Sequence, residues 1–421
     1  MTATGLTTLN SGLRVATYNL PHAHSVSVGI WVGAGARDET ESEQGIAHML
    51  EHMAFKGTHK RTAQQIAIEV ENVGGYMNAH TSREETAYYI RVLPEHTELA
   101  LDILVDIVGN STLPEDEIER ERGVIIQEIG QAMDTPDDLV FDRFTSACYH
   151  NQSFGKAILG TVDTVSGFSQ ADLHGFLQRH YGAQQMLIVA AGPVDHDAFV
   201  AMVEAASSTI TMVPGAARKT PKWTAGTDIV QRDLEQTHIL FGLPCAGAAS
   251  EDRFATMLLS NLYGGGMSSR LFQQVREERG LCYSIFSFAQ MYSDGGVLGV
   301  YAGTSPEQAD EMLHVASAAL TDIISALDEA ELNRAKAQLR AALLMGQESV
   351  TGMAESLARQ ILLRGEPTPT EVNLAGIDSV SVADIQALVA NLLNESAPVL
   401  AAVGPSAQMM DHIALQGLLR A

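Results

Sequence analysis

Alternating apolar positions and helical runs of apolar positions divide the chain into predicted strands and helices. Residues 13–17 and 26–32 place apolar side chains at every second position, which predicts two strands. Residues 76–92 predict a hairpin with a polar turn at 82–85. A strand is expected over residues 186–191, and helices are expected from about Glu43, over 62–73, over 97–108, from about Pro114, over 169–180 and over 198–207.

Three dipeptides recur in the second half of the chain at one constant offset of 212 residues. They are Pro94-Glu95 with Pro306-Glu307, Ala171-Asp172 with Ala383-Asp384, and Gly192-Pro193 with Gly404-Pro405. Each pair alone is a weak signal, but three pairs at one offset and in the same order predict a duplicated domain. A basic stretch with Pro and Gly at 214–222 is the best candidate boundary. We therefore predict domains at residues 1–212 and 229–421, joined by a linker at 213–228.

The helix expected from about Glu43 carries His48 and His52 within an otherwise apolar run. Residues four apart on a helix lie one turn apart on the same side, which suits two imidazoles that bind one metal ion. Glu51, three residues after His48, projects toward the same side. Burying these groups together is costly unless a cation neutralises and coordinates them. The order His-x-x-Glu-His is the inverzincin zinc motif, although so short a motif can also arise by chance.

The helix expected from Pro114 carries two glutamates, Glu121 and Glu128, that lie two turns apart on one side. A catalytic zinc ion takes a third protein ligand and keeps one position open for water. Glu128 lies between the apolar run 124–126 and Ile129, whereas most acidic residues of this helix alternate with arginines as a solvated face. Glu128 is therefore the candidate third ligand.

The corresponding positions of the second half carry no ligand set. Thr256 and Ser260 align with the two histidines, and Ala335 and Ala342 align with the two glutamates. The second half is therefore expected to keep the fold without the metal.

The second half also has a distinctive stretch of its own, from residue 263 to residue 283. A helix is predicted over 269–279, ended by Gly280, and Tyr283 opens a strand. The glycines at 264–266 are not a phosphate loop, because no Gly-Lys-Ser/Thr follows. On this pattern alone, Arg276 would be a surface cation and Tyr283 a half-buried aromatic residue.

Composition limits the possible partners. The 421 residues, 46 % hydrophobic and 18 % charged, predict a soluble globular chain of two or more domains without a run long enough to span a membrane. A net charge of −25 argues against nucleic acids and anionic membranes and would attract basic peptides. Three cysteines, far apart and odd in number, predict no disulfide framework, and the N-terminus lacks a signal pattern. A cytoplasmic protein is expected.

In these motifs the chain resembles the pitrilysin family of inverzincin zinc metallopeptidases, and within it the mitochondrial processing peptidase beta subunit and its bacterial homologues. The resemblance extends over nearly the whole chain and is carried by residues 45–58, 74–84, 119–128 and 276–283. It implies an α+β fold of two tandem homologous domains, each a mixed β-sheet flanked by α-helices. This is the metallohydrolase fold of the processing peptidases.

The resemblance also implies zinc ligands and a base. The family's third ligand lies 76 residues after the second motif histidine, which falls on Glu128, and its outer acidic group falls on Glu121. One zinc ion per chain would then be held by His48, His52 and Glu128. Glu51 would act as the general base.

Two groups of residues are expected to contact substrate. Arg276 and Tyr283 match the family's substrate-contacting pair, which has the same spacing of seven. Asn78, Ala79 and Thr81 would hydrogen-bond a peptide backbone as an added strand. The alternative for this strand is an ordinary sheet edge.

The expected activity is that of a zinc-dependent metalloendopeptidase that cleaves peptides or presequence-like unfolded segments inside a dimeric chamber. In longer family members, four such domains share one chain, so two copies of this chain would supply the same set. Two alternatives remain: a catalytic subunit that requires a degenerate partner chain, or a non-catalytic core-type subunit. The partners are therefore peptides and a second copy or an inactive relative, with no nucleic acid and no membrane span.

Overall fold

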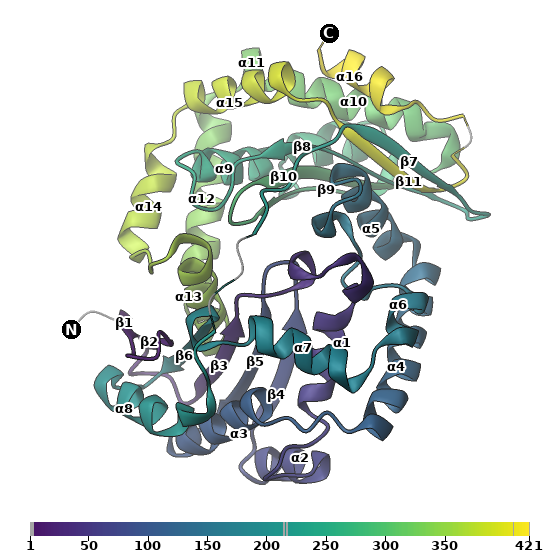
Figure 1. The fold of residues 1–421 in the computed structure, drawn as a ribbon. Helices are drawn as coiled ribbons and strands as arrows, with labels where there is room; N and C mark the ends of the chain where they lie inside the picture. Colours follow the sequence, from purple (N-terminus) through teal and green to yellow (C-terminus); the bar gives the residue numbers. More distant parts are fainter. Residues whose placement is uncertain (1–3, 214, 216–217, 407, 421) are drawn as a thin grey trace. The chain divides into compact units, whose positions relative to one another are not determined.

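The computed structural model describes residues 4–213, 215, 218–406 and 408–420. The chain forms two compact units (Figure 1). The first unit consists of Met1–Gly130, Lys156–Lys219 and Met345–Pro367, and the second consists of Gln131–Gly155, Thr220–Leu344 and Thr368–Ala421.

The first unit is built on a six-stranded mixed sheet. Its order is β1 (Thr4–Thr8), β2 (Arg14–Asn19), β6 (Met186–Gly192), β3 (Val26–Val32), β5 (Thr86–Val92) and β4 (Tyr76–Thr81). Only β2 and β6 run parallel. The predicted strands are confirmed, whereas β1 carries no clear apolar alternation and was not expected.

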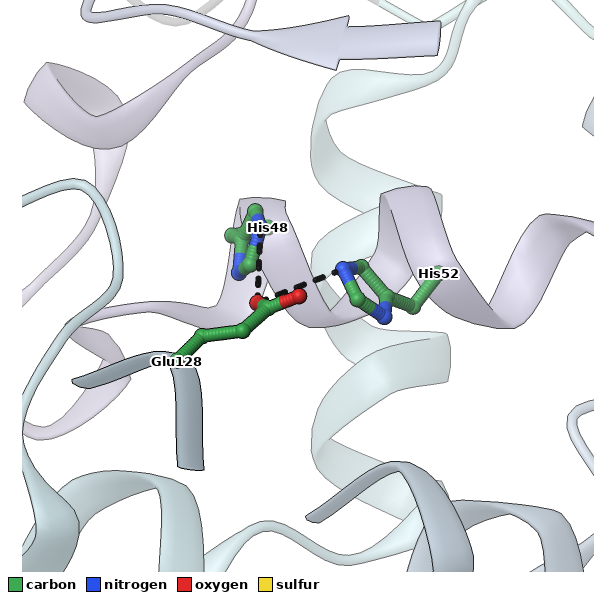
Figure 2. A group of neighbouring side chains, drawn as sticks. All are labelled: His48, His52 and Glu128. Atoms are coloured by element: carbon green, nitrogen blue, oxygen red, sulfur yellow. Dashed lines mark ion pairs between the residues drawn. The ribbon is translucent and has the colours of Figure 1, made fainter. Parts of the chain in front are cut away.

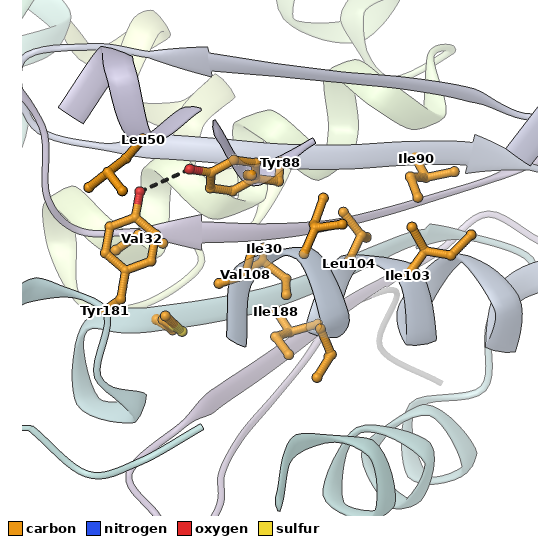
Figure 3. Packing of buried hydrophobic residues seen from close by; sticks show 14 of the residues in the cluster. Ile30, Val32, Leu50, Tyr88, Ile90, Ile103, Leu104, Val108, Tyr181 and Ile188 are labelled. Carbon is orange, nitrogen blue, oxygen red and sulfur yellow. Dashed lines mark hydrogen bonds between the residues drawn. The ribbon is translucent and has the colours of Figure 1, made fainter. Parts of the chain in front are cut away.

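The main core of the first unit lies between this sheet and a layer of helices. Its principal helices are α1 (Ile46–Ala54), α2 (Ala63–Asn72), α3 (Thr97–Gly109), α4 (Glu115–Asp134), α7 (Gln170–His180) and α8 (His196–Ala206). Figure 3 shows strand and helix side chains that interlock there, with the hydroxyls of Tyr88 and Tyr181 hydrogen-bonded at 2.9 Å. This core fixes α1, the helix that carries the predicted metal ligands.

The second unit repeats the first sheet without its β1. Its order is β7 (Gly226–Gln231), β11 (Val399–Gly404), β8 (Thr237–Cys245), β10 (Gly296–Thr304) and β9 (Cys282–Met291), with only β7 and β11 parallel. The helices of its main core are α9 (Arg253–Gly264), α10 (Ala309–Thr321), α11 (Ile323–Ala326), α12 (Glu329–Gly346), α14 (Thr370–Ser379), α15 (Val382–Glu395) and α16 (His412–Leu419). The predicted duplication is thereby confirmed, with two tandem domains of one topology.

The recurring dipeptides occupy equivalent places in the two units. The two Pro-Glu pairs open 3₁₀ turns, Pro94–His96 and Pro306–Gln308. Gly192 and Gly404 end equivalent strands with φ of +144° and +137°. At both glycines an added Cβ would lie 2.6 Å from a backbone oxygen, so close packing requires glycine in each repeat.

Each sheet is covered on its second face by a helix that comes from the other half of the chain. Helix α13 (Val350–Arg364) packs on β2, β3 and β6 of the first unit, and α5 (Pro136–Cys148) packs on β8 and β11 of the second (Figure 1). The compact units therefore differ from the predicted continuous domains at residues 131–155 and 345–367. Strand β7 also begins inside the stretch predicted as a linker, of which residues 214, 216 and 217 lie outside the described residues.

Two predicted helices differ in detail from those observed. Helix α1 begins at Ile46 and not near Glu43, because Gly45 adopts a left-handed φ of +91° between α1 and the 3₁₀ turn Glu41–Glu43. The stretch predicted as a helix over 269–279 has π-helical pitch at Phe272–Glu277. Its backbone closes a Glu278 N–H to Gln273 carbonyl bond of 2.9 Å, and Gly280 leaves the helix with φ of +63°.

The remaining elements are short. They are α6 (Val162–Gly167) and the 3₁₀ turns Ala36–Asp38, Ser153–Gly155, Ala183–Gln185 and Ser207–Thr209. Among the described residues, no single helix is both long enough and apolar enough to cross a membrane. The bent pair α14 and α15 meets that test only by length and composition.

Candidate metal centre

Helix α1 places His48 and His52 one turn apart on its less buried side. Their ring centroids are 4.6 Å apart. The other side of α1 is fixed in the core by residues such as Met49 and Met53, both fully buried. Glu39, 4 % exposed, accepts hydrogen bonds from the backbone N–H groups of Gly45 and Ala47 at 3.0 and 2.9 Å, and so caps the start of the helix.

Glu128 of α4 completes a group of three possible ligands (Figure 2). Its Oε2 lies 3.7 Å from Nε2 of His48 and 3.7 Å from Nε2 of His52. The ligand atoms of the three residues all lie within 4.8 Å of one another, and among the described residues this is the only such group. Two imidazoles and one carboxylate are the donor set of a catalytic zinc ion.

The surroundings of these side chains also fit a cation. Glu128 Oε2 is buried and has no hydrogen-bond donor among the described residues, a costly state that a positive ion between the three side chains would relieve. Burial and the neighbouring His52 lower the pKa of His48 to about 4. His48 is therefore neutral at pH 7, as a metal ligand must be.

Glu121 lies on the far side of His52 and does not face the ligand group. Its Oε2 is 2.9 Å from His52 Nδ1, and its Oε1 is 2.6 Å from Lys56 Nζ. Burial raises the pKa of Glu121, but hydrogen bonds and charges from Lys56 and His52 outweigh that effect and lower the pKa below its usual range. Glu121 is therefore a carboxylate, so His52 Nδ1 carries the hydrogen and Nε2 is left to bind metal.

Glu51 is near the ligand group but outside it. Thr81 Oγ1 donates a hydrogen bond of 2.6 Å to Glu51 Oε2. Burial raises the pKa of this carboxyl above its ordinary value, although the bond from Thr81 partly offsets the rise. A fixed carboxylate with a raised pKa is suited to take and return a proton near neutral pH.

The predicted substrate strand is the edge strand β4, which pairs only with β5 among the described strands. Asn78 and Ala79 lie on this free edge, with the Asn78 side-chain oxygen 2.9 Å from the Ala79 backbone N–H. Thr81 also has a second role that was not predicted from the sequence: its side chain donates a hydrogen bond to Glu51. Backbone alternation along a strand gives no sign of such a contact.

Arg276 and Tyr283 meet in the second unit. The Arg276 guanidinium lies over the rings of Phe272 and Tyr283, 4.6 and 5.0 Å from their centroids. Tyr283 is 76 % exposed, and therefore it is not the half-buried strand residue that its position alone suggested. The π-helical turn and the start of β9 hold these groups together as a cation–aromatic stack in which Tyr283 is exposed and Arg276 is half-buried.

The positions in the second unit that align with the metal site carry small or hydroxyl side chains. Thr256, Ser260 and Ala335 are all buried in or beside its core. Two residues important to the first unit's site were not singled out from the sequence, namely Lys56 and Glu39. Lys56 lies two residues beyond the end of α1 and contacts Glu121 of α4, so no local spacing in the sequence indicates this contact.

Two family models match successive parts of the chain. The model described as insulinase, peptidase family M16, matches residues 14–162, and the model described as the peptidase M16 inactive domain matches residues 167–339. A Rickettsia felis protein named as an uncharacterized zinc protease is 39 % identical over 399 residues, covering 94 % of this chain and 97 % of its own. The uncharacterized zinc protease YmxG of Bacillus subtilis is 34 % identical over 405 residues, covering 96 % and 98 %.

A solved structure has the same fold. A protease from Helicobacter pylori superposes with a TM-score of 0.88 at 24 % identity, covering 96 % of this chain and all of its own. Two repeats of one mixed-sheet topology, with the His-x-x-Glu-His helix in the first only, define a protein of the inverted-motif metallopeptidase class. The chain belongs to the peptidase M16 (insulinase) family, with its N-terminal and C-terminal domains in that order, and the predicted pitrilysin-family membership is confirmed.

Proposed function

We propose that the protein is a zinc-dependent metalloendopeptidase with one zinc ion per chain, held by His48, His52 and Glu128. The observation that carries this proposal is the convergence of these three side chains within 4.8 Å, with Glu51 fixed beside them by Thr81. A non-catalytic relative has no need for both a complete ligand set and a separately held carboxylate. Membership of a family whose relatives are named zinc proteases supports the same conclusion.

Each residue of the site has a distinct part in the proposed reaction. Zinc at this site would polarise the scissile carbonyl and lower the pKa of an attacking water to about 7. Glu51 takes the proton from that water and later delivers it to the leaving amine. Glu121 fixes the orientation of His52 from behind. The free edge of β4 hydrogen-bonds the substrate backbone, which gives affinity with little sequence selectivity.

The proposed substrates are flexible peptides or presequence-like unfolded segments, cleaved within a closed dimer of this chain. Arg276 stacks on the exposed Tyr283 in a unit that has no ligand set among its described residues. A two-fold dimer would bring this stack of one subunit to the zinc of the other and would exclude folded proteins. A degenerate partner chain in place of the second copy is the alternative assembly.

The activity is tested with the purified chain alone, on an internally quenched basic peptide, with and without a metal chelator. Chelator-sensitive cleavage and about one zinc per chain by metal analysis are expected. Zinc binding without cleavage would favour the form that needs a partner chain. Neither zinc nor cleavage would favour a non-catalytic subunit and overturn the proposal.

The assembly is tested by mixing two inactive variants, Glu51→Gln and Arg276→Ala. If Arg276 acts on the partner's zinc, a mixed dimer contains one intact site of two, so each mixed dimer should have about half of the activity of a wild-type dimer. If the subunits exchange and no activity returns, Arg276 acts within its own chain or not at all.

A further inference from the structure

Lys56 contacts Glu121, the neighbour of His52, and is not one of the three candidate ligands. It follows the C-terminal residue of α1 by two positions, and its Nζ lies 2.6 Å from Glu121 Oε1. The Lys56 side chain is 27 % exposed and the Glu121 side chain 8 %. The pair is thus mostly removed from water, where ion pairs interact more strongly than at the surface.

The two oxygens of Glu121 have different donors. Oε1 faces Lys56, and Oε2 faces Nδ1 of His52 at 2.9 Å. A carboxylate with one donor can rotate about its last side-chain bond, whereas donors on both oxygens fix its plane. Lys56 also supplies the positive charge that a buried carboxylate requires.

A second lysine in the loop between α1 and α2 forms a surface ion pair with which the Lys56 contact can be compared. Lys60 contacts Asp102 at 2.6 Å, but their side chains are 57 % and 43 % exposed. Such exposed pairs contribute little, because water screens them and both side chains lose freedom. Lys56 differs from Lys60 both in burial and in the partner it holds, which is the direct neighbour of a metal ligand.

We propose that Lys56 is a positioning residue of the metal centre. It holds the Glu121 carboxylate in the plane that accepts the His52 Nδ1 hydrogen, and this keeps His52 Nε2 directed at the metal. The proposed chain of contacts therefore runs from Lys56 to Glu121, from Glu121 to His52, and from His52 to the zinc ion. The inference rests on the zinc site proposed above, and it assigns part of the zinc affinity to a side chain that never touches the ion.

The test measures zinc affinity directly, by competition with a chromophoric chelator, on the full-length protein. Lys56→Met should weaken zinc binding by about 10-fold, the lower end of the range for residues that support a metal ligand. Lys56→Arg, which keeps the charge and a donor, should recover most of the affinity. Lys60→Met is the matched control and should leave the affinity unchanged.

The double variant decides whether Lys56 acts through Glu121. In a Glu121→Gln background, Lys56→Met should cause little further loss of zinc affinity, because the group it positions is already gone. Thermal melting of the metal-free proteins checks that each variant is folded, and Lys56→Gln replaces Lys56→Met if that variant is not. Unchanged zinc affinity in folded Lys56→Met (or in Lys56→Gln where it is used instead), or an equal loss in the Glu121→Gln background, would overturn the inference. Failure of the wild-type chain to bind zinc would instead overturn the proposed function.

Discussion

Helices α13 and α5 are exchanged between the halves of the chain: each packs on the sheet formed mainly by the other half. A substitution late in the chain, on α13, should therefore destabilise the first unit. Leu357 lies on α13 and is 3 % exposed, in a cluster with Trp31 of β3 and Leu187 of β6. Although residue 357 belongs to the second half of the sequence, its contacts belong to the first unit. Leu357→Ala should therefore loosen the sheet of the first unit and leave the second unit intact.

The expected magnitude follows from the loss of buried volume. Truncating a fully buried leucine to alanine costs about 2–5 kcal/mol, depending on how far the cavity collapses. A loss of about 2 kcal/mol changes the folded-to-unfolded ratio by roughly 30-fold. The cost in Leu357→Ala falls on one unit, so the two sheets should respond differently.

Hydrogen exchange followed by mass spectrometry resolves the two sheets. Amides of β3 and β6 should exchange at least roughly 30-fold faster in Leu357→Ala wherever exchange requires opening of the unit, whereas those of β8 and β11 should be unchanged. Phe144→Ala on α5 is the mirror experiment, because Phe144 is 2 % exposed in the core of the second unit. It should leave β3 and β6 protected and expose β8 and β11.

A surface substitution on the same helix controls for helix propensity. Arg359 is exposed on α13, and Arg359→Ala should change stability by no more than about 0.5 kcal/mol. Faster exchange in β8 and β11 than in β3 and β6 of Leu357→Ala would refute the assignment of α13 to the first unit. An equal change in both sheets would show that the units open together.

Three further predictions concern the site and the pH response. Glu51→Gln should retain zinc but lose roughly 10²–10⁴-fold in peptide hydrolysis, and a metal-free variant would contradict its assignment as base. Glu128→Gln should strip zinc, whereas Glu121→Gln should weaken zinc affinity by about 10–100-fold, so equal losses by metal analysis would refute the division. Burial raises the pKa of Asp102, but hydrogen bonds from two cationic neighbours outweigh that effect and lower the pKa. The Asp102 carboxylate therefore stabilises the fold above about pH 4. This contribution is lost as the pH falls through the lowered pKa. Urea midpoints measured from pH 6 to pH 2 should therefore fall less steeply in Asp102→Asn, and parallel curves would refute this.

Local patterns were sufficient for most elements of the first unit. The helices expected from residues 62 and 169 begin there with capping side chains: Thr62 accepts a hydrogen bond from the Gln65 N–H at 3.2 Å, and Ser169 caps α7 in the same way. The proximity of His48 and His52 could also be predicted, because residues four apart on a helix lie one turn apart on the same side. Glu128 was a candidate third ligand from its place beside an apolar run, and the family resemblance supported that choice, because its helix is distant in the sequence from the two histidines.

Choices that depend on tertiary packing were not accessible in this way. Helix α5 shows a clear period in Val140, Phe144 and Cys148, so its existence could have been predicted. The sheet that α5 covers could not be predicted, because an apolar stripe on a helix does not specify which of two similar sheets it packs on. The π-helical pitch near Arg276, where the guanidinium lies over the rings of Phe272 and Tyr283, was likewise not indicated by any local propensity.

The second unit shows how a duplicated half can keep the fold with other residues at the candidate ligand positions. Imidazole and carboxylate groups packed side by side are costly to bury, and a cation at the proposed site would offset that cost in the first unit. Thr256, 0 % exposed, and Ala335, 2 % exposed, stand at the equivalent places and bring no charge into the core. The second core therefore has no need of an ion, while the shared sheet order and the exchanged helices keep the two halves structurally alike. The surface of the second unit instead carries the stack of Arg276 on the exposed Tyr283, which is the proposed substrate contact.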